Sequence, residues 1–247
     1  MAAGVLITAL GAAATLGWTL LRSVDFGYAL WYDVLAIEAH IGRFGPENRH
    51  RQGFARTDKA EHRRLFAAIN RAVHGDTAIL GRLAYRDPQG RRLGPLLHIG
   101  EIVHLKDVAK LIRGTLPWGW GMVGLWLVLS LAAWRLQVAL PPWRWRWGGL
   151  LFTVAGLGLV VVWQGPLALF HRWHIWVFPP NHPWYFPYQE SLMTTLMKAP
   201  DLFGAIAVAW GGLTIILWLI LLVVADGLLG LANYGRGRPP RDPPPCL

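Results

Sequence analysis

Three histidines and three tryptophans stand close together in LFHRWHIWVFPPNHPWYFPYQE, residues 169–190. The histidines are His171, His174 and His182. An imidazole exchanges a proton near neutral pH and also binds metal ions, so this segment could carry acid–base catalysis or a metal site. Two histidines three residues apart are a weak metal signal, because a complete site needs a third ligand with suitable geometry. We therefore predict no metal here and keep metal binding as the alternative.

A second group of titratable residues lies in HIGEIVHLKDVAKLIRG, ahead of the second apolar stretch. Glu101, His104 and Asp107 follow one another at three-residue spacing, which places neighbours side by side on a helix. A carboxylate bonded to one ring nitrogen of a histidine raises the basicity of the other nitrogen. His104 is thus a candidate general base supported by both carboxylates. The alternative is a solvated helix face that also carries Lys106 and Lys110.

Three other chemistries are not favoured. A bis-histidine haem would need histidines on facing transmembrane helices, and three of the four apolar stretches contain none. The single cysteine, Cys246, lies in a proline-rich tail, which excludes a disulfide framework and an outward-facing Cys–His zinc site. No Gly-x-Ser-x-Gly motif surrounds a serine, although Ser191 lies close to the histidine segment. No cofactor is expected.

The elements that must position these residues are apolar. Of the 247 residues, 54% are hydrophobic and 15 are tryptophan, which is more than a soluble domain carries. Four stretches lack Asp, Glu, Lys and Arg over about 20 residues, the length that crosses the hydrocarbon core of a bilayer. These stretches are 2–21, 115–134, 148–170 and 202–225. The sequence predicts an all-α polytopic membrane protein with four transmembrane helices.

The predicted organisation has four helices joined by segments of different character. The transmembrane helices are 1–22, 115–135, 148–170 and 202–232. The joining segments are a mostly helical extracytoplasmic cap at 23–114, a cytoplasmic loop at 136–147, an extracytoplasmic His/Trp-rich loop at 171–201 and a disordered cytoplasmic tail at 233–247. Other tryptophans near the helix ends are typical of an interfacial aromatic belt.

Charge predicts the orientation. Basic residues mark the loop after the second helix and the tail, namely Arg135, Arg144, Arg146, Arg236, Arg238 and Arg241. Short basic loops stay in the cytoplasm, so both termini are predicted inside and the cap outside. The net charge of +10 comes without a nucleic-acid motif, so no nucleic-acid partner is expected. A basic cap fits anionic lipid headgroups, and a merely solvated basic surface is the alternative.

Two amphipathic helices are predicted in the cap. The first starts after Thr57 or Asp58 with Glu61 in a capping box, and ends at Gly75. Its apolar stripe is Leu65, Phe66, Ile69 and Val73. The second is HIGEIVHLKDVAKLIRG, with Ile102, Leu105, Val108, Ala109 and Ile112 on one face. YRDPQGRRLGP between them is predicted to be a loop.

The two segments together resemble the signatures of the lipoprotein intramolecular transacylases. GEIVHLKDVAKLIRG resembles a Glu-x-x-His-hydrophobic-x-Asp-Val signature before the second transmembrane helix. LFHRWHIWVFPPNHPWYFPYQESLM resembles a second signature of Leu-Phe-His, then Phe-Pro, Trp, Pro, an acidic residue and an apolar pair. The helix order agrees, so the resemblance covers most of the chain. Gly100 replaces an expected Arg, Glu190 replaces an Asp, and the Trp–Pro spacing is one residue shorter.

The resemblance implies four helices under an extracytoplasmic cap in a bacterial cytoplasmic membrane. It implies an enzyme that moves the sn-2 acyl chain of a diacylated lipoprotein onto the amino group of its N-terminal cysteine, giving the lyso-form. By motif match, His104 and His171 are the catalytic pair, with Glu101, Asp107 and Glu190 in support. The substrate would be confined by aromatic residues, namely Trp173, Trp176, Trp184, Tyr185 and Phe186.

Two alternatives remain from other classes. One is a non-enzymatic membrane subunit that binds a metal or scaffolds a complex through its His-rich loop. The other is an acyltransferase or hydrolase that acts on a different membrane lipid. Metal content and lipoprotein N-termini distinguish them from the transacylase.

Overall fold

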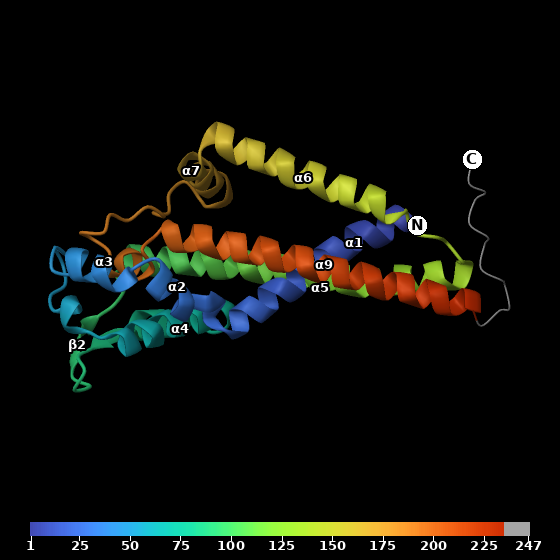
Figure 1. Ribbon diagram of the computed structural model, residues 1–247. Helices are drawn as coiled ribbons and strands as arrows, with labels where there is room; N and C mark the ends of the chain where they lie inside the picture. Colours follow the sequence, from blue (N-terminus) through green and yellow to red (C-terminus); the bar gives the residue numbers. More distant parts are fainter. Residues whose placement is uncertain (235–247) are drawn as a thin grey trace. The chain divides into compact units, whose positions relative to one another are not determined.

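The computed structural model describes the backbone of residues 1–234 and the side chains of residues 1–228. This part of the chain is almost entirely helical (Figure 1). The α-helices are α1 (Ala2–Ser23), α2 (Tyr28–Val34), α3 (Ile37–Phe44), α4 (Lys59–His74), α5 (Ile99–Leu136), α6 (Trp143–Gln164), α7 (Pro166–Val177), α8 (Leu192–Met197) and α9 (Asp201–Tyr234). The remaining elements are η1 (Asp25–Gly27), η2 (Phe54–Arg56), η3 (Thr77–Arg82), β1 (Ala84–Arg86) and β2 (Arg92–Pro95). Of the predicted cytoplasmic tail at 233–247, residues 235–247 lie outside the described residues.

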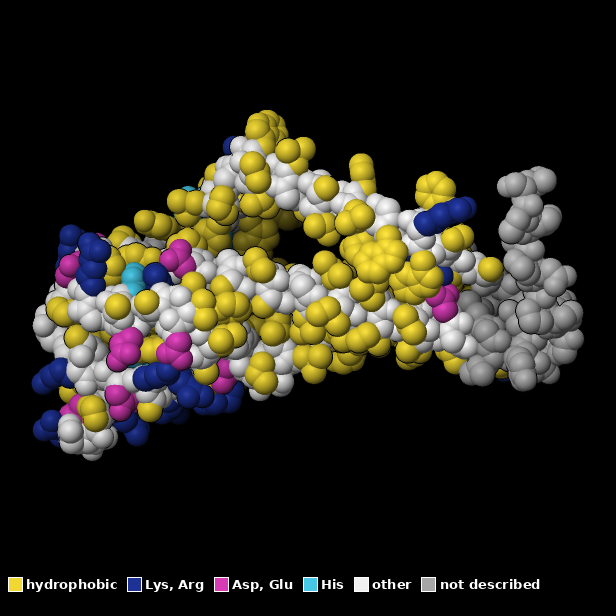
Figure 2. Space-filling view, in the orientation of Figure 1, with side chains coloured by type: hydrophobic (Ala, Val, Ile, Leu, Met, Phe, Trp, Pro, Cys, Tyr) yellow, Lys and Arg dark blue, Asp and Glu magenta, His cyan; other side chains and the backbone are white. Residues whose placement is uncertain are grey.

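Four of these helices are long and apolar enough to cross a membrane. They are α1, α5, α6 and the Asp201–Leu228 part of α9. The prediction of an α-helical membrane protein with four apolar helices is confirmed at this level. Figure 2 shows charged side chains gathered over the segments of α2, α3, α4 and the hairpin, whereas hydrophobic side chains cover the long helices.

Helix boundaries differ from the sequence prediction in two places. The second cap helix and the second apolar stretch form one continuous helix, α5, which contains Pro117. The third apolar stretch instead breaks at Gly165, whose φ of 80° is a left-handed conformation that favours glycine. Pro166 then opens α7, where its missing N–H costs no helical hydrogen bond. His171 therefore lies within a separate helix and does not end a transmembrane one.

The described chain divides into two compact units. Unit 1 comprises Met1–Gly17, Trp118–Thr153 and the chain from Gly211 onward. Small residues of α1, including Ala9, Ala12 and Ala13, are fully buried in its core. At the other end of the unit, the guanidinium of Arg146 donates to both oxygens of Asp226 at 2.6 and 2.9 Å. Such bidentate pairs are strong and directional, so this pair fixes the start of α6 against α9.

Unit 2 comprises Trp18–Pro117 and Val154–Trp210 and holds both candidate segments. The capping prediction for α4 is confirmed, because the Asp58 side chain accepts the Glu61 N–H at 2.8 Å. The predicted stripe is the core of the unit: Leu65, Phe66, Ile69 and Val73 are all buried. From α5, Leu105 and Ala109 join the same core. Burial of these apolar side chains provides the main stabilisation of unit 2.

The loop prediction for residues 85–95 is wrong in part. Strands β1 and β2 pair antiparallel across a turn that contains Gly90 with a φ of 81°. Tyr85 sits in β1 with 1% of its surface exposed, and its hydroxyl donates to the Gln52 carbonyl at 2.7 Å. A buried aromatic residue anchors the hairpin, which proline and glycine punctuation alone did not reveal.

His62 is the most constrained histidine of this core. It is 2% exposed, and its ring is hydrogen-bonded with the Tyr32 hydroxyl at 2.8 Å and the Thr57 hydroxyl at 2.6 Å. Burial lowers the pKa of His62 from 6.5 to about 4, although Asp58 and Glu61 act in the opposite direction. The folded protein thus keeps this ring uncharged under conditions where the unfolded chain protonates it.

We predict that unit 2 loses stability as the pH falls from about 6.5 to about 4, because only the unfolded state binds the His62 proton there. Thermal unfolding of the purified protein at pH 7.5 and at pH 5 measures the effect. In His62→Gln the difference in unfolding temperature between pH 7.5 and pH 5 should be smaller than in the wild type. In the exposed control His50→Gln this difference should match the wild type. An undiminished difference in His62→Gln would contradict the assignment.

Candidate active site

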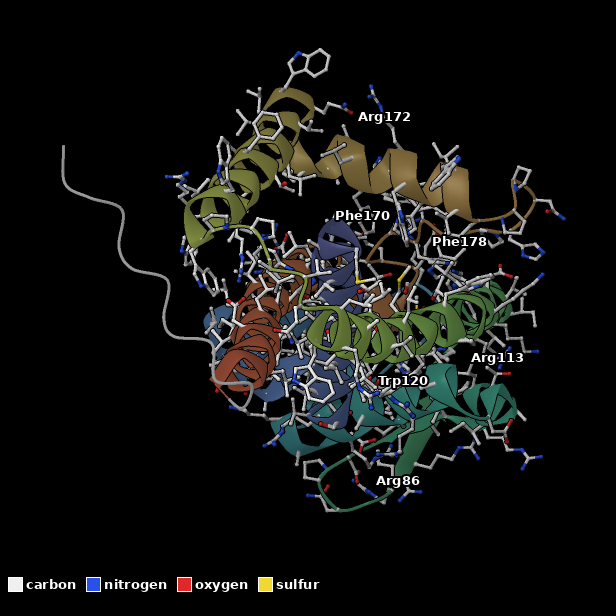
Figure 3. The ribbon with its side chains drawn as sticks, turned by 90° about the vertical axis from the view of Figure 1, so that its right-hand side faces the viewer. Arg86, Arg113, Trp120, Phe170, Arg172 and Phe178 are labelled. Carbon is white, nitrogen blue, oxygen red and sulfur yellow. The ribbon has the colours of Figure 1, made fainter. Side chains whose placement is uncertain are left out.

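Helix α7 turns one face towards the interior of unit 2. Phe170, His174 and Phe178 follow at four-residue spacing, which places them on one side of the helix. His174 and Phe178 are each only 6% exposed. On the opposite side Ile175 and Trp176 are 68% and 84% exposed. Figure 3 shows the Arg172 side chain pointing away from the side of Phe170 and Phe178.

The buried face of α7 meets the start of α5 at two histidines. The ring centroids of His104 and His174 lie 6.1 Å apart. The pair is enclosed by aromatic rings: Phe170 lies 4.0 Å and Trp184 4.8 Å from His174, and Phe178 lies 4.9 Å from His104. Phe186 completes the enclosure at 6.1 Å from His104. We call this arrangement of His104 and His174 with the four aromatic residues the imidazole site.

Hydrogen bonding sets the chemistry of His174. Its Nδ1 lies 2.7 Å from the Phe170 carbonyl oxygen. A carbonyl oxygen only accepts, so Nδ1 carries the proton and the lone pair of the neutral ring is on Nε2. Burial lowers the pKa of His174 below its ordinary value, a nearby His171 acts in the same direction, and the Phe170 bond opposes both. His174 is therefore an uncharged base at neutral pH, with its reactive nitrogen defined.

His104 complements this base. Its Nδ1 is buried, and among the described residues it has no hydrogen-bond partner. An unpaired polar atom in an apolar enclosure costs free energy unless a ligand satisfies it. The unsatisfied nitrogen of His104 thus marks a place where a polar group of a ligand would gain a hydrogen bond.

His171, the sequence-predicted partner of His104, lies one turn before His174. Its ring packs against Trp184 at 5.4 Å and Tyr185 at 5.9 Å. Among ring contacts of the described residues, none joins His171 to His104. The motif match assigned no catalytic role to His174. The four-residue spacing of Phe170, His174 and Phe178 was the available signal for it.

The carboxylates near His104 have other partners in the structure. Asp107 Oδ2 lies 2.6 Å from Nδ1 of His182, so Asp107 orients that histidine. Glu101 is fully buried, and it accepts from the His98 N–H at 2.6 Å and from the Ser191 hydroxyl at 2.5 Å. Neither carboxylate is hydrogen-bonded to His104, so the helical spacing did not predict their partners.

The other predicted residues divide between the site and the surface. Trp184 and Phe186 line the imidazole site, as described above. Trp173 contacts His174 at 4.9 Å although it is 46% exposed, whereas Trp176 and Tyr185 are largely exposed. Glu190 accepts from Arg49 at 3.3 Å and has no ring or hydrogen-bond contact with His104 or His174 among the described residues. Within the described residues, no three His, Cys, Asp or Glu side chains are placed to hold a metal ion.

Comparison with known proteins assigns no family to this chain. No protein-family model matches the sequence, and no curated protein or solved structure matches it. The interpretation of the site therefore depends on its geometry and chemistry, together with the resemblance of the two motifs.

We predict that Glu101 and Asp107 have separable roles. Glu101→Ala leaves the Ser191 hydroxyl and the His98 N–H without their acceptor, and each buried donor left unpaired costs about 1–3 kcal/mol of stability. The thermal unfolding temperature and the amount of protein in membranes should both fall. Asp107→Asn, the matched control on the same helix, should accumulate like the wild type. Equal loss of stability in both variants would contradict this division.

Proposed function

We propose that the protein is an intramolecular O-to-N acyltransferase. It moves the sn-2 acyl chain of a lipoprotein's diacylglyceryl group onto the α-amino group of the N-terminal cysteine, which gives the lyso-form. The observation that carries the proposal is the His174 Nε2 lone pair beside the unsatisfied His104, inside an aromatic enclosure. The two motif resemblances select this reaction among the acyl transfers that such a pair can catalyse.

The reaction needs a base first. An N-terminal amine is mostly protonated near neutral pH and is not a nucleophile in that form. His174 Nε2 takes its proton, because this nitrogen is free and its ring is uncharged. The amine nitrogen then attacks the ester carbonyl carbon, so that a C–N bond forms and the carbonyl oxygen gains negative charge.

His104 serves the second half of the reaction. In the tautomer with the proton on Nδ1, it donates a hydrogen bond to the developing oxyanion or to the departing glyceryl oxygen. The C–O bond of the ester breaks, and the glyceryl oxygen receives the proton that the His174 imidazolium holds. The attacking nitrogen loses its second proton to the solvent, so the protonated amine and the ester become amide, alcohol and one released proton, with no water consumed.

The remaining contribution to the rate is the orientation of the ester and the amine. Donor and acceptor belong to one molecule, so the site must fold the substrate back on itself. Holding two reacting groups together contributes roughly 7–11 kcal/mol in favourable cases. Phe170, Phe178, Trp184 and Phe186 supply an apolar enclosure around the imidazoles, which also keeps water from the ester. The largely exposed Ile175 and Trp176 of α7 suit contact with lipid at the membrane interface.

The proposal places the protein in the bacterial cytoplasmic membrane. Both termini face the cytoplasm, and the imidazole site faces the extracytoplasmic side, where diacylated lipoproteins reside. Four apolar helices and the short basic loop around Arg144 support this placement. The reaction requires no cofactor, because the ester supplies the free energy for amide formation.

We predict that His104→Ala and His174→Ala abolish conversion while the protein still accumulates in the membrane. Loss of a positioned general acid or base lowers the rate about 10²–10⁴-fold. His171→Ala should lower the rate less, because its ring packs on Trp184 and contacts neither His104 nor the reacting nitrogen. Mass spectrometry of a reporter lipoprotein's N-terminal peptide measures the lyso-form.

The control for these variants is Arg172→Ala, on the exposed side of α7. It should convert the reporter like the wild type. Full conversion by both His104→Ala and His174→Ala would refute the acyltransferase proposal. Loss in His171→Ala with full conversion in His174→Ala would instead show that His171 is the partner of His104.

A further inference from the structure

A second feature of unit 2 lies beside the imidazole site and is not used by the proposed chemistry. It is a cleft of about 450 Å³ lined by His50, Arg51, Pro95, His98 and Glu190. Its residues come from the segment before α4, from the end of the hairpin, from the start of α5 and from the loop before α8. We call it the arginine cleft.

Arg51 is the unusual group in this cleft. Its Nε and one terminal nitrogen, Nη1, are buried, and neither has a hydrogen-bond partner among the described residues. The adjacent turn also contains a buried hydrogen-bond donor without an acceptor. Asn48 is 2% exposed and accepts the N–H groups of His50 and Arg51, yet its own Nδ2 has no acceptor. Three buried donors without acceptors on one short turn indicate a missing acceptor, and an oxyanion supplies several acceptor atoms at once.

The other charges of the cleft leave Arg51 as the group to be neutralised. Glu190 is engaged by Arg49 at 3.3 Å, which offsets its charge. His98 accepts the Gly100 N–H at Nδ1, so in the neutral ring the proton lies on Nε2 and adds a donor. One unpartnered guanidinium with a neighbouring imidazole N–H suits a singly charged carboxylate better than a doubly charged phosphate.

The arginine cleft lies close to the imidazole site. The ring centroids of His98 and Phe186 are 5.3 Å apart and those of Phe186 and His104 are 6.1 Å apart, so the two histidine rings are at most about 11 Å apart. An extended peptide covers about 3.3–3.6 Å per residue, so roughly three to five residues join the two sites. His98 is also six residues farther than His104 from the apolar part of α5, about 9 Å along the helix. The occupant therefore lies on the water side of the reacting ester.

We propose that the arginine cleft binds the polypeptide of the substrate through an acidic side chain roughly three to five residues after the acylated cysteine. This inference rests on the proposed function and adds a substrate preference to it. The carboxylate satisfies Arg51, and the imidazole site holds the cysteine that the same chain carries. Acidic lipoproteins are thus the preferred substrate class.

The experiment uses the full-length protein in membranes and three reporter lipoproteins. The reporters are identical except that two of residues 4–6, counted from the acylated cysteine as residue 1, are Asp, Asn or Lys. The rate of lyso-form production is measured by mass spectrometry of the N-terminal peptide. The wild type should convert the Asp reporter about tenfold faster than the Asn reporter, and the Lys reporter should be slowest. These comparisons vary only the substrate, so they do not depend on the folding of a variant.

Variants of the protein test whether Arg51 is the group that recognises the charge of the reporter. Arg51→Ala should remove the difference in rate between the Asp reporter and the Asn reporter. Arg51→Glu should make the Lys reporter the fastest. Arg92→Ala removes the same charge from an exposed position of β2 and should keep the wild-type order.

The outcomes separate the two proposals. If the wild type converts no reporter, the acyltransferase proposal fails. If it converts all three at one rate, or if Arg51→Ala slows all three equally, the arginine cleft does not bind an acidic peptide. Equal rates that inorganic phosphate lowers equally for all three reporters would show that the cleft takes a small free anion.

Discussion

The buried carboxylate of Glu101 is the constraint on which the arrangement of the candidate site depends. It accepts the N–H of His98, the residue before α5, and the hydroxyl of Ser191, the residue before α8. A negative charge at a helix N-terminus is favourable, but burying it away from water requires that its oxygens be satisfied. The two bonds meet that requirement and tie residues 90 positions apart in the chain. The loop between α7 and α8 is thereby held beside α5, and its aromatic residues cover His104.

The same loop contacts α5 again one and a half turns later. His182 is hydrogen-bonded to Asp107, Trp184 packs on His174, and Phe186 lies between His98 and His104. Three kinds of contact thus hold an irregular segment of polypeptide in place: a buried carboxylate, a histidine–carboxylate pair and packed aromatic rings. An irregular segment has no hydrogen-bond ladder of its own, so such side-chain contacts must define its conformation. A catalytic arrangement on such a loop is precise only when these supports are present.

The imidazole site also shows how one fold separates two histidines by environment. His174 donates its Nδ1 proton to a carbonyl of its own helix, and that bond decides which nitrogen is basic. Among the described residues His104 has no such partner at Nδ1, so no bond of this kind decides which of its nitrogens carries the proton. An acid–base pair needs this kind of asymmetry, because two identical imidazoles would compete for one role. The helix break at Gly165 is the backbone feature that makes this asymmetry attainable, because the break frees α7 to turn the face of Phe170, His174 and Phe178 inward.

Much of the architecture followed from the sequence alone, for simple physical reasons. Charge-free stretches of membrane-spanning length predict helices, and the four appear. Asp58 and Glu61 predict the start of α4, because an N-cap bond is local, and the stripe from Leu65 to Val73 predicts its buried face. The tertiary structure decided what local patterns do not contain. It placed His174 against His104, and it gave Glu101 and Asp107 the partners Ser191 and His182. Those choices depend on the rotation of α7 after Gly165 and on contacts between segments 70 or more residues apart, which spacing along one helix does not encode.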